Sequence, residues 1–302
     1  MIKNQKKATL FALTAVAMWS TVASAFKVTL TYFSPIQMLL VATLTTILTL
    51  IGVCHRQKKL HLLKTYFVKR PLYYLLLGLI NPFFYYLILF QAYDLLPAQQ
   101  AQSLNYTWAI SLTILAVPFL GQKLTKKDAI AIFMAYSGAL IIATKGNLLE
   151  LEFTSPLGVF LALFSTLLWA IYWILNAKNS GDPIVSLLLC FLLGFPAVFI
   201  ATPMLSDFNM PDWQGWAGAI YIGLFEMGFA FVAWLSALRY AENTAKISNL
   251  IFISPFLSLV LLNMIIDEPI YPATLVGLIF IISGLLIQQL KSKAVKKPVP
   301  YS

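Results

Sequence analysis

The chain has 302 residues, of which 60% are hydrophobic and only 11% are charged. A soluble domain carries roughly 45–50% apolar and about 25% charged residues, so this composition excludes an ordinary water-soluble protein. The net charge of +10 comes from 21 basic and 11 acidic residues. On a soluble protein it would suggest a nucleic-acid partner, whereas in a membrane protein it reflects basic loops on one side. We therefore expect the lipid bilayer as a partner, and no nucleic acid.

In chain order, ten apolar segments approach the length of a membrane-spanning helix, which needs about 20 mostly apolar residues. They run over residues 8–26, 36–53, 72–91, 97–119, 129–144, 156–175, 184–202, 213–236, 244–265 and 273–290. Ten helices use roughly two-thirds of the chain, and the short loops leave too little for a soluble catalytic or nucleotide-hydrolysing domain. The sequence predicts an all-α polytopic membrane protein with ten transmembrane helices.

The basic residues indicate the orientation of these helices. If the N-terminus is cytoplasmic, only Lys27 and Lys145 fall on the far side of the membrane. The other 19 fall in cytoplasmic segments, which hold Lys3, Lys6 and Lys7, six residues from Arg56 to Arg70, Lys123, Lys126 and Lys127, Lys178, Arg239 and Lys246, and four lysines from Lys291 to Lys297. Because basic residues collect in cytoplasmic loops, we expect a multi-pass protein of the cytoplasmic (inner) membrane with both termini inside.

The first apolar segment has a competing interpretation as a secretory signal peptide. Basic residues precede Ala8, and Ala23-Ser24-Ala25 resembles a cleavage site. Removal of residues 1–25 would leave nine spans and reverse the charge pattern at one end, so we favour a spanning helix. The two cysteines, Cys54 and Cys190, show neither disulfide nor metal-cluster spacing.

The two halves of the chain resemble each other. Gly78-Leu79 and Gly223-Leu224 align at an offset of 145, and Ser137-Gly138 matches Ser283-Gly284 at 146. Ala12-Leu13 with Trp19 matches Ala162-Leu163 with Trp169 at an offset of 150. We therefore divide the chain into a first repeat, 1–145, and a second, 146–302. Five spans in each make the second repeat inverted, as in many transporters whose substrate site lies near the membrane midplane.

Several short motifs occur at corresponding places in the two halves. They are Trp19 with Lys27, Ala92-Tyr93 with Ala98 to Ser103, Gly121-Gln122-Lys123-Leu124-Thr125, Ser137-Gly138-Ala139-Leu140, Ala237-Leu238-Arg239-Tyr240, Ser254-Pro255, Asp267-Glu268-Pro269 and Ser283-Gly284. With these motifs the chain resembles the EamA-type family of the drug/metabolite transporter superfamily. The resemblance implies a ten-helix carrier that exports small metabolites, amino acids or amphiphilic compounds. Gln122 departs from the family's Gly-Glu motif in the first half, whereas Glu268 keeps the acid in the second.

Glu226 is the one acidic residue deep in a predicted span. An ionisable residue at that depth is costly and is a functional candidate by default. It lies on a stripe of small residues, Gly223, Ala230, Ala233 and Ala237, which lets another helix approach closely and turns the carboxyl group into the bundle. We interpret Glu226 as a proton-coupling group or a counter-ion for a substrate amine. The alternative is a protonated acid that serves packing between helices.

Asn81 occupies the matching position in the first half, on the stripe Gly78, Asn81, Tyr85, Ile88 and Ala92. Pro82 should kink the helix beside it, and Pro255 is expected to act similarly in the ninth span. Two repeat-related polar groups at mid-depth are expected to face one cavity, although Asn81 could equally be interhelical glue.

Further substrate-binding candidates are aromatic or polar residues within the spans. An aromatic lining could stack on a flat or cationic substrate, although core packing explains most single rings. The fourth span begins with Gln99, Gln100, Gln102 and Ser103, which we interpret as the wet face of a vestibule. Lys27 is expected to snorkel to the interface. The candidates are Trp19, Ser20, Tyr85, Asn105, Trp108, Trp169, Tyr172 and, beside Lys246 at an inner entrance, Asn249.

Motifs for other chemistry are absent from the sequence. It has no P-loop for ATP, no HExxH zinc site and no G-x-S-x-G nucleophile, and one mid-membrane acid excludes an aspartyl pair. We expect no enzyme, cofactor or metal, but a secondary active transporter that exports a small organic metabolite and is coupled to protons. The alternatives are an uncoupled facilitator and a non-transporting scaffold or sensor with the same fold.

Overall fold

The computed structural model describes residues 3–149, 153–177, 179, 181–207 and 210–289. Lys178, Leu290 and the four lysines from Lys291 to Lys297 lie outside the described residues. Throughout the described part the regular structure is helical, without a strand. The elements are α1 Gln5–Leu30, α2 Pro35–Arg56, α3 Leu62–Lys69, α4 Pro71–Gly78, the π-helical η1 Leu79–Phe84, α5 Tyr85–Leu95, α6 Ala98–Asn105, α7 Trp108–Leu120, α8 Lys126–Ala143, α9 Pro156–Ala177, α10 Pro183–Leu205, α11 Trp213–Phe225, α12 Phe229–Tyr240, α13 Thr244–Ser248, the 3₁₀ turn η2 Asn249–Ile253, α14 Ser254–Ile266 and α15 Pro272–Gln289.

Within the described residues, eight stretches are long and apolar enough to cross a membrane, some of them made of two or three consecutive elements. They are Gln5–Leu30, Pro35–Arg56, Pro71–Leu95, Ala98–Leu120, Pro156–Ala177, Pro183–Leu205, Trp213–Tyr240 and Lys246–Ile266. The predicted spans 129–144 and 273–290 correspond to α8 and α15. α8 begins with Lys126, Lys127 and Asp128, which shortens its apolar part, and α15 falls among the shorter apolar helices. The structure therefore supports a multi-pass membrane protein but does not confirm ten spans.

Side chains that satisfy the first free N–H groups mark several helix starts. Ser34 with Gln37 and Thr125 with Asp128 form capping boxes at α2 and α8. Asp182 accepts from the backbone N–H groups of Ile184 and Val185 at the start of α10. Each of these caps fixes the residue at which a helix begins.

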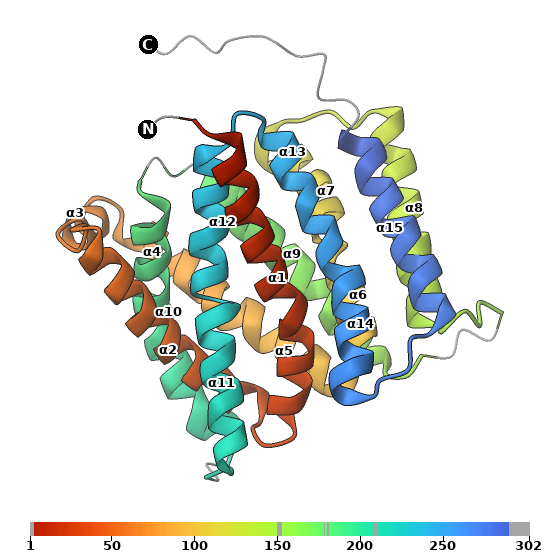
Figure 1. Ribbon diagram of the computed structural model, residues 1–302, viewed down its shortest axis with the longest axis horizontal. Helices are drawn as coiled ribbons and strands as arrows, with labels where there is room; N and C mark the ends of the chain where they lie inside the picture. The colour runs from red at the N-terminus through yellow and green to blue at the C-terminus, as the bar shows by residue number, and fades with distance from the viewer. Residues whose placement is uncertain (1–2, 150–152, 178, 180, 208–209, 290–302) are drawn as a thin grey trace.

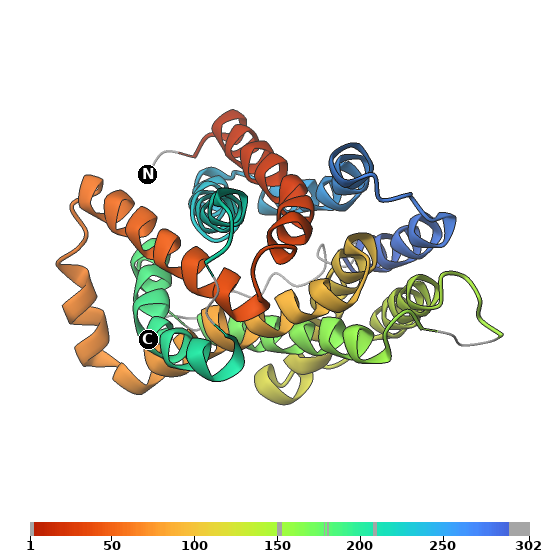
Figure 2. The ribbon, with the colours of Figure 1, turned by 90° about the horizontal axis from the view of Figure 1, so that it is seen from below.

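The helices of the two halves pack in matching pairs. In the first half α1 packs on α12 and α14 of the second half, and its counterpart α9 packs on α5 and α7. Likewise α2 packs on α11, and its counterpart α10 packs on α4 and η1. α2 also packs on α10, and α8 on α15. Figures 1 and 2 show α8 and α15 side by side at one end of the molecule and α3 at the other. We call the face where α1 begins and α15 ends the terminal face, and the other the opposite face (Figure 1).

Small residues allow several of these pairs to approach closely. Ala8, Ala12 and Ala15 on α1 are fully buried in a cluster with Ala233 and Ala237 on α12. The segment that could also be interpreted as a signal peptide is thus part of the bundle. The predicted small-residue stripe is buried, as expected for close helix contacts, but it is divided between two helices.

Candidate functional site

The third span of the first half is broken at Asn81. Its backbone is extended, with φ −139° and ψ 112°, inside the π-helical turn η1. Pro82 follows and offers no N–H to the helix, so the predicted kink is present. Asn81 lies near the middle of the apolar stretch Pro71–Leu95, which places an irregular piece of backbone deep in the bundle.

The third span of the second half is broken as well, at the position 145 residues further on. α11 ends at Phe225 and α12 begins at Phe229, so Glu226, Met227 and Gly228 form the connection. Gly228 has φ −101° and ψ −92°, outside the helical region. No proline lies at this position to indicate the break. The only signals were Gly228 and the repeat relation to Asn81.

Glu226 is held at the break by two contacts from the first half. The Tyr86 hydroxyl donates to Glu226 Oε1 at 3.2 Å, and the Trp19 indole N–H donates to the Glu226 backbone carbonyl at 3.4 Å. The second carboxyl oxygen, Oε2, is buried and has no hydrogen-bond partner. A buried polar atom of this kind is costly unless something pairs with it.

Asn81 is also incompletely satisfied. Its side chain is fully buried and interacts with the Tyr172 hydroxyl on α9. Neither Oδ1 nor Nδ2, however, has a hydrogen-bond partner of normal geometry. Two repeat-related breaks therefore both carry a polar side chain with buried atoms and unused hydrogen-bonding capacity.

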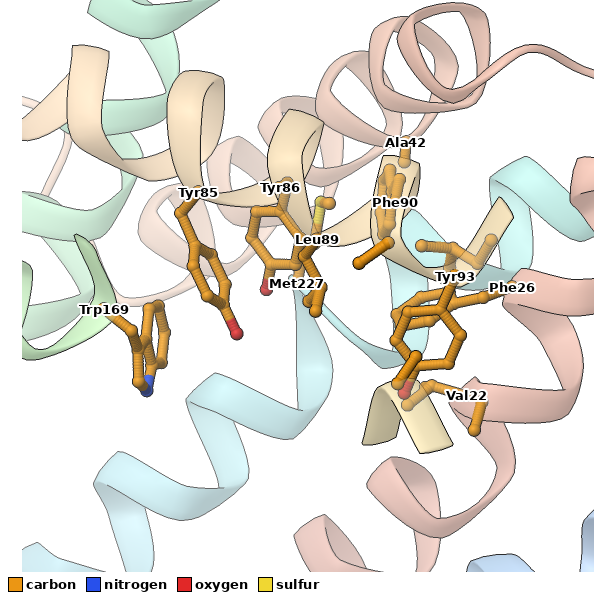
Figure 3. Packing of buried hydrophobic residues seen from close by; sticks show 14 of the residues in the cluster. Val22, Phe26, Ala42, Tyr85, Tyr86, Leu89, Phe90, Tyr93, Trp169 and Met227 are labelled. Carbon is orange, nitrogen blue, oxygen red and sulfur yellow. The ribbon is translucent and has the colours of Figure 1, made fainter. Parts of the chain in front are cut away.

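Aromatic rings fill the space between the two breaks. Trp169 stacks on Tyr85 at 4.5 Å between ring centroids and on Tyr172 at 5.4 Å. Phe231 on α12 meets Trp169 at 5.9 Å and Trp19 at 5.7 Å, both edge to face. Figure 3 shows Trp169, Tyr85 and Tyr86 side by side, with both tyrosine hydroxyls directed away from the α5 backbone. Rings from α1, α5, α9 and α12 thus form one continuous set, which we call the aromatic cluster.

Two polar pairs border the aromatic cluster. The Tyr85 hydroxyl donates to Asn105 Oδ1 at 3.5 Å, and Asn105 Nδ2 donates to Ser165 Oγ at 3.1 Å. Ser20 is fully buried and its hydroxyl donates to Ser254 Oγ at 3.3 Å. Asn105 ends α6 and Ser254 begins α14, so both fourth spans bring polar groups beside the breaks.

The structure thus brings Glu226, Trp19, Asn81, Tyr85, Asn105, Trp169 and Tyr172 together, with Ser20 next to them. Trp108 is half-buried against the core at the start of α7, without a ring contact to the aromatic cluster among the described residues. Asn249 is exposed at the start of η2 and lies apart from it. Sequence reasoning missed Tyr86 and Phe231, although their spacing of 145 is the same offset that relates Asn81 to Glu226.

The vestibule predicted at the start of the fourth span is not present. Gln99, Gln100, Gln102 and Ser103 are all buried, with at most 6% of each exposed. Gln99 Nε2 donates to the Pro269 carbonyl at 2.6 Å, and Gln100 Nε2 donates to the Ile142 carbonyl at 3.0 Å. These amides satisfy backbone carbonyls of neighbouring segments, so they form contacts between helices instead of a wet face.

Glu268 links the second half to the start of α6 in the first half, at the same end of the molecule. Its carboxylate accepts from the backbone N–H groups of Ala98 and Gln99, each at 3.0 Å, at the start of α6. An acid at a helix N-terminus is favourable because of the helix dipole. Lys27 lies nearby and donates to the Tyr93 carbonyl at 2.7 Å, so it binds backbone instead of extending freely to the interface.

At the repeat-related place on the terminal face, the described residues form no such contact. Gln122 is exposed, and its backbone N–H donates to the Ala116 carbonyl on the preceding helix, α7. The start of α13 is capped by the local Asn243, whose Oδ1 accepts from Lys246 N. Where Gln122 replaces the acid of the motif, the described residues therefore show no link of this kind between the halves.

No group of three His, Cys, Asp or Glu side chains that could hold a metal ion occurs within the described ranges. Cys54 and Cys190 are both free and buried. The polar chemistry of the site therefore comes from one carboxyl group, amides, hydroxyls and indole N–H groups.

Comparison with known proteins gives a consistent result. Residues 6–144 and 156–288 each match the EamA-like transporter family model. "Uncharacterized transporter YvbV" of Bacillus subtilis is 24% identical over 286 residues, which covers 93% of this chain and 91% of the relative. "Protein PecM" of Dickeya dadantii is 26% identical, covering 70% and 72%. A solved crystal structure of a protein superposes with a TM-score of 0.69 over 97% of this chain and all of that one, at 17% identity, and shows the same fold.

Proposed function

The chain belongs to the EamA-like transporter family, and from this we propose that it is a secondary transporter of a small organic molecule that works by alternating access around Asn81 and Glu226. The observation that carries the proposal is the pair of breaks, one in each half, near the middle of two membrane-spanning stretches. In transporters, discontinuous helices at the midplane form substrate and ion sites. Irregular backbone at that depth is tolerated only where protein covers it or it lines a cavity.

Two inverted five-helix repeats supply the alternation. In Figure 1, α1 runs from the terminal face to the opposite face and α9 runs the other way, and the matching helix pairs support an exchange of roles between the halves. α8 and α15 complete the ten spans, each as the fifth helix of its repeat. The hydrogen bonds from the start of α6 to Glu268 link the two halves on the opposite face. The described residues form no matching link on the terminal face. This asymmetry supports a conformation that opens towards the terminal face.

The distribution of charge gives the orientation. The terminal face carries the basic segment from Arg56 to Arg70 and the lysines from Lys123 to Lys127. Under the positive-inside rule this face is cytoplasmic. Both termini then lie on the cytoplasmic side of the inner membrane, and we propose that the transporter moves its substrate outwards from that side. Glu226 exchanges a proton as the site alternates, because its buried Oε2 must pair with a proton or with a cationic group of the substrate.

Accessibility of the site tests transport without a known substrate. We would place single cysteines at Asn81 and at Glu226 in a background with Cys54 and Cys190 replaced by serine. Both positions are expected to react with a water-soluble maleimide from one face. A cysteine at Leu89, which is 3% exposed in the core, serves as the protected control. Protection of both site cysteines equal to that of the control would favour a non-transporting scaffold.

Proton coupling is tested in proteoliposomes with a transported compound. Glu226→Gln preserves the size of the side chain and the acceptor for Tyr86 but removes the titrating group. It is expected to abolish gradient-driven accumulation and to leave counterflow exchange measurable. Accumulation at the wild-type level would argue against coupling at Glu226, and absence of accumulation by the wild type would favour an uncoupled facilitator.

A further inference from the structure

We infer that the substrate is an organic amine with a flat aromatic body and a neutral hydrogen-bonding group at its far end. This inference rests on the proposed transport function and names the chemical class that the site would accept. It follows from three features of the site. These are the charge available at Glu226, the rings beside it and the free amide of Asn81.

The acidic group of the site is Glu226, which carries a negative charge when it is not protonated. Glu226 Oε1 already accepts from Tyr86, and the buried Oε2 has no partner. The phenols of Tyr85, Tyr86, Tyr93 and Tyr106 lie close enough to interact with its charge. Among the described residues, no lysine or arginine forms an ion pair with Glu226. A substrate carboxylate would meet like charge without a counter-ion, whereas a substrate ammonium would pair with Oε2.

The surroundings of Glu226 suit an ammonium group attached to an aromatic body. Trp19 and Tyr86 both contact Glu226, and Phe231 packs against Trp19. A cation within about 6 Å of such rings is attracted by their π faces, most strongly by tryptophan. The rest of the substrate would lie among the rings of the aromatic cluster, where an aromatic group makes favourable stacked or edge-to-face contacts.

The far end of this substrate is assigned to Asn81. From Tyr86 at Glu226, a continuous series of ring contacts runs through Tyr85, Trp169 and Tyr172, and the last interacts with Asn81. Oδ1 and Nδ2 of Asn81 are both buried, and neither has a hydrogen-bond partner of normal geometry. An amide can both donate and accept, so it matches a neutral hydroxyl or amide better than a second charge.

Binding of matched probes to the purified full chain tests the assignment by isothermal titration calorimetry at neutral pH. The probes are tyramine, phenethylamine, which lacks the phenol, 2-cyclohexylethylamine, which lacks the aromatic ring, 3-(4-hydroxyphenyl)propionate, which is an anion, and tyrosine, which is a zwitterion. Tyramine is expected to bind best. Because a hydrogen bond to a charged group is a strong one, Glu226→Gln should weaken tyramine binding roughly 10- to 100-fold.

Variants separate the two ends of the probe. Glu242→Gln makes the same change at an exposed glutamate on the terminal face and should leave tyramine binding unchanged. Asn81→Ala should weaken tyramine about 5- to 10-fold while changing phenethylamine little. Glu226→Asp keeps the charge and should retain the preference for the amine over the anion, which guards against loss of folding in Glu226→Gln.

The outcomes distinguish this inference from the transport function. Tighter binding of the anion than of tyramine, or equal tyramine affinity in Glu226→Gln and the wild type, would overturn the amine assignment. So would a failure of every amine to bind to a protein whose site cysteines are accessible, in which case the transport proposal would stand. Protected site cysteines would instead overturn the transport proposal itself.

Discussion

Two glycines immediately before the breaks should be intolerant of even one added methyl group. A Cβ placed at Gly78 would lie 2.5 Å from the Cys190 carbonyl oxygen and 2.9 Å from the Gly194 backbone nitrogen. A Cβ at Gly223 would lie 2.5 Å from the Ala42 carbonyl oxygen. Each glycine lies three residues before Asn81 or Glu226 and packs on the second helix of the other half. In both cases the nearest neighbour is a backbone atom, so whole helices would have to move apart.

The size of the expected loss of stability follows from a comparison with a third glycine, Gly52, whose surroundings are open. Overpacking of this kind costs about 1–3 kcal/mol, whereas replacing glycine by alanine in a helix gains about 1 kcal/mol of intrinsic preference. Gly52 on α2 has nothing within 4 Å of an added Cβ, so Gly52→Ala carries the second effect alone. Gly78→Ala and Gly223→Ala should therefore each be less stable than Gly52→Ala by about 1–3 kcal/mol.

The free energy of unfolding can be measured by titrating sodium dodecyl sulfate into mixed micelles and following the loss of helical circular dichroism. Equal free energies of unfolding for the three alanine variants would refute the close approach of the helices at Gly78 and Gly223. A loss confined to one of the two would refute the equivalence of the halves at this level. In either case the geometry of the breaks would need revision.

Two further predictions concern the ends of the helices. Burial by itself raises the pKa of Asp182, but the hydrogen bond and charge of Lys59 and the backbone N–H groups at the start of α10 outweigh it and hold the pKa below its ordinary value of 3.8. Ionised Asp182 therefore stabilises the fold fully above pH 3.8, and this stabilisation is lost as the pH falls through the lower pKa of the folded protein. Asp182→Asn should lower the free energy of unfolding by about 1 kcal/mol at neutral pH. In acid denaturation measurements the difference between the variant and the wild type should disappear. Glu268→Ala leaves the backbone N–H groups of Ala98 and Gln99 without their acceptor and should lower the free energy of unfolding by about 1–2 kcal/mol. Hydrogen exchange at those two amides should become faster. Unchanged exchange would argue against the contact between Glu268 and the start of α6.

Repeat spacing predicted more of the site than any local motif did. The offset of 145 relates Asn81 to Glu226, and both residues lie at breaks in the structure. The same offset relates Tyr86 to Phe231, which the sequence analysis did not use. The break at Glu226 could not be predicted from propensity, because glycine is tolerated in a helix whereas proline after Asn81 is not.

The burial of the polar residues at the start of the fourth span could not be predicted from the sequence either. Polar residues at a predicted membrane surface can face water or pair with neighbouring backbone, and the sequence does not distinguish these cases. Gln99 bonds to Pro269 and Tyr271 and is 1% exposed. Its partners lie about 170 residues away along the chain, so only the packed arrangement of the halves reveals them.

By itself the sequence determined the class of the protein, the segments that form its helices and the relation between its halves, because apolar length, charge alternation and spacing are properties of the chain alone. Tertiary structure decided which polar groups remain unpaired. Whether Glu226 Oε2 finds a partner depends on what α1 and α5 bring to it across the bundle. Such contacts arise when helices distant in sequence pack together, and they are fixed by the shapes of both surfaces at once.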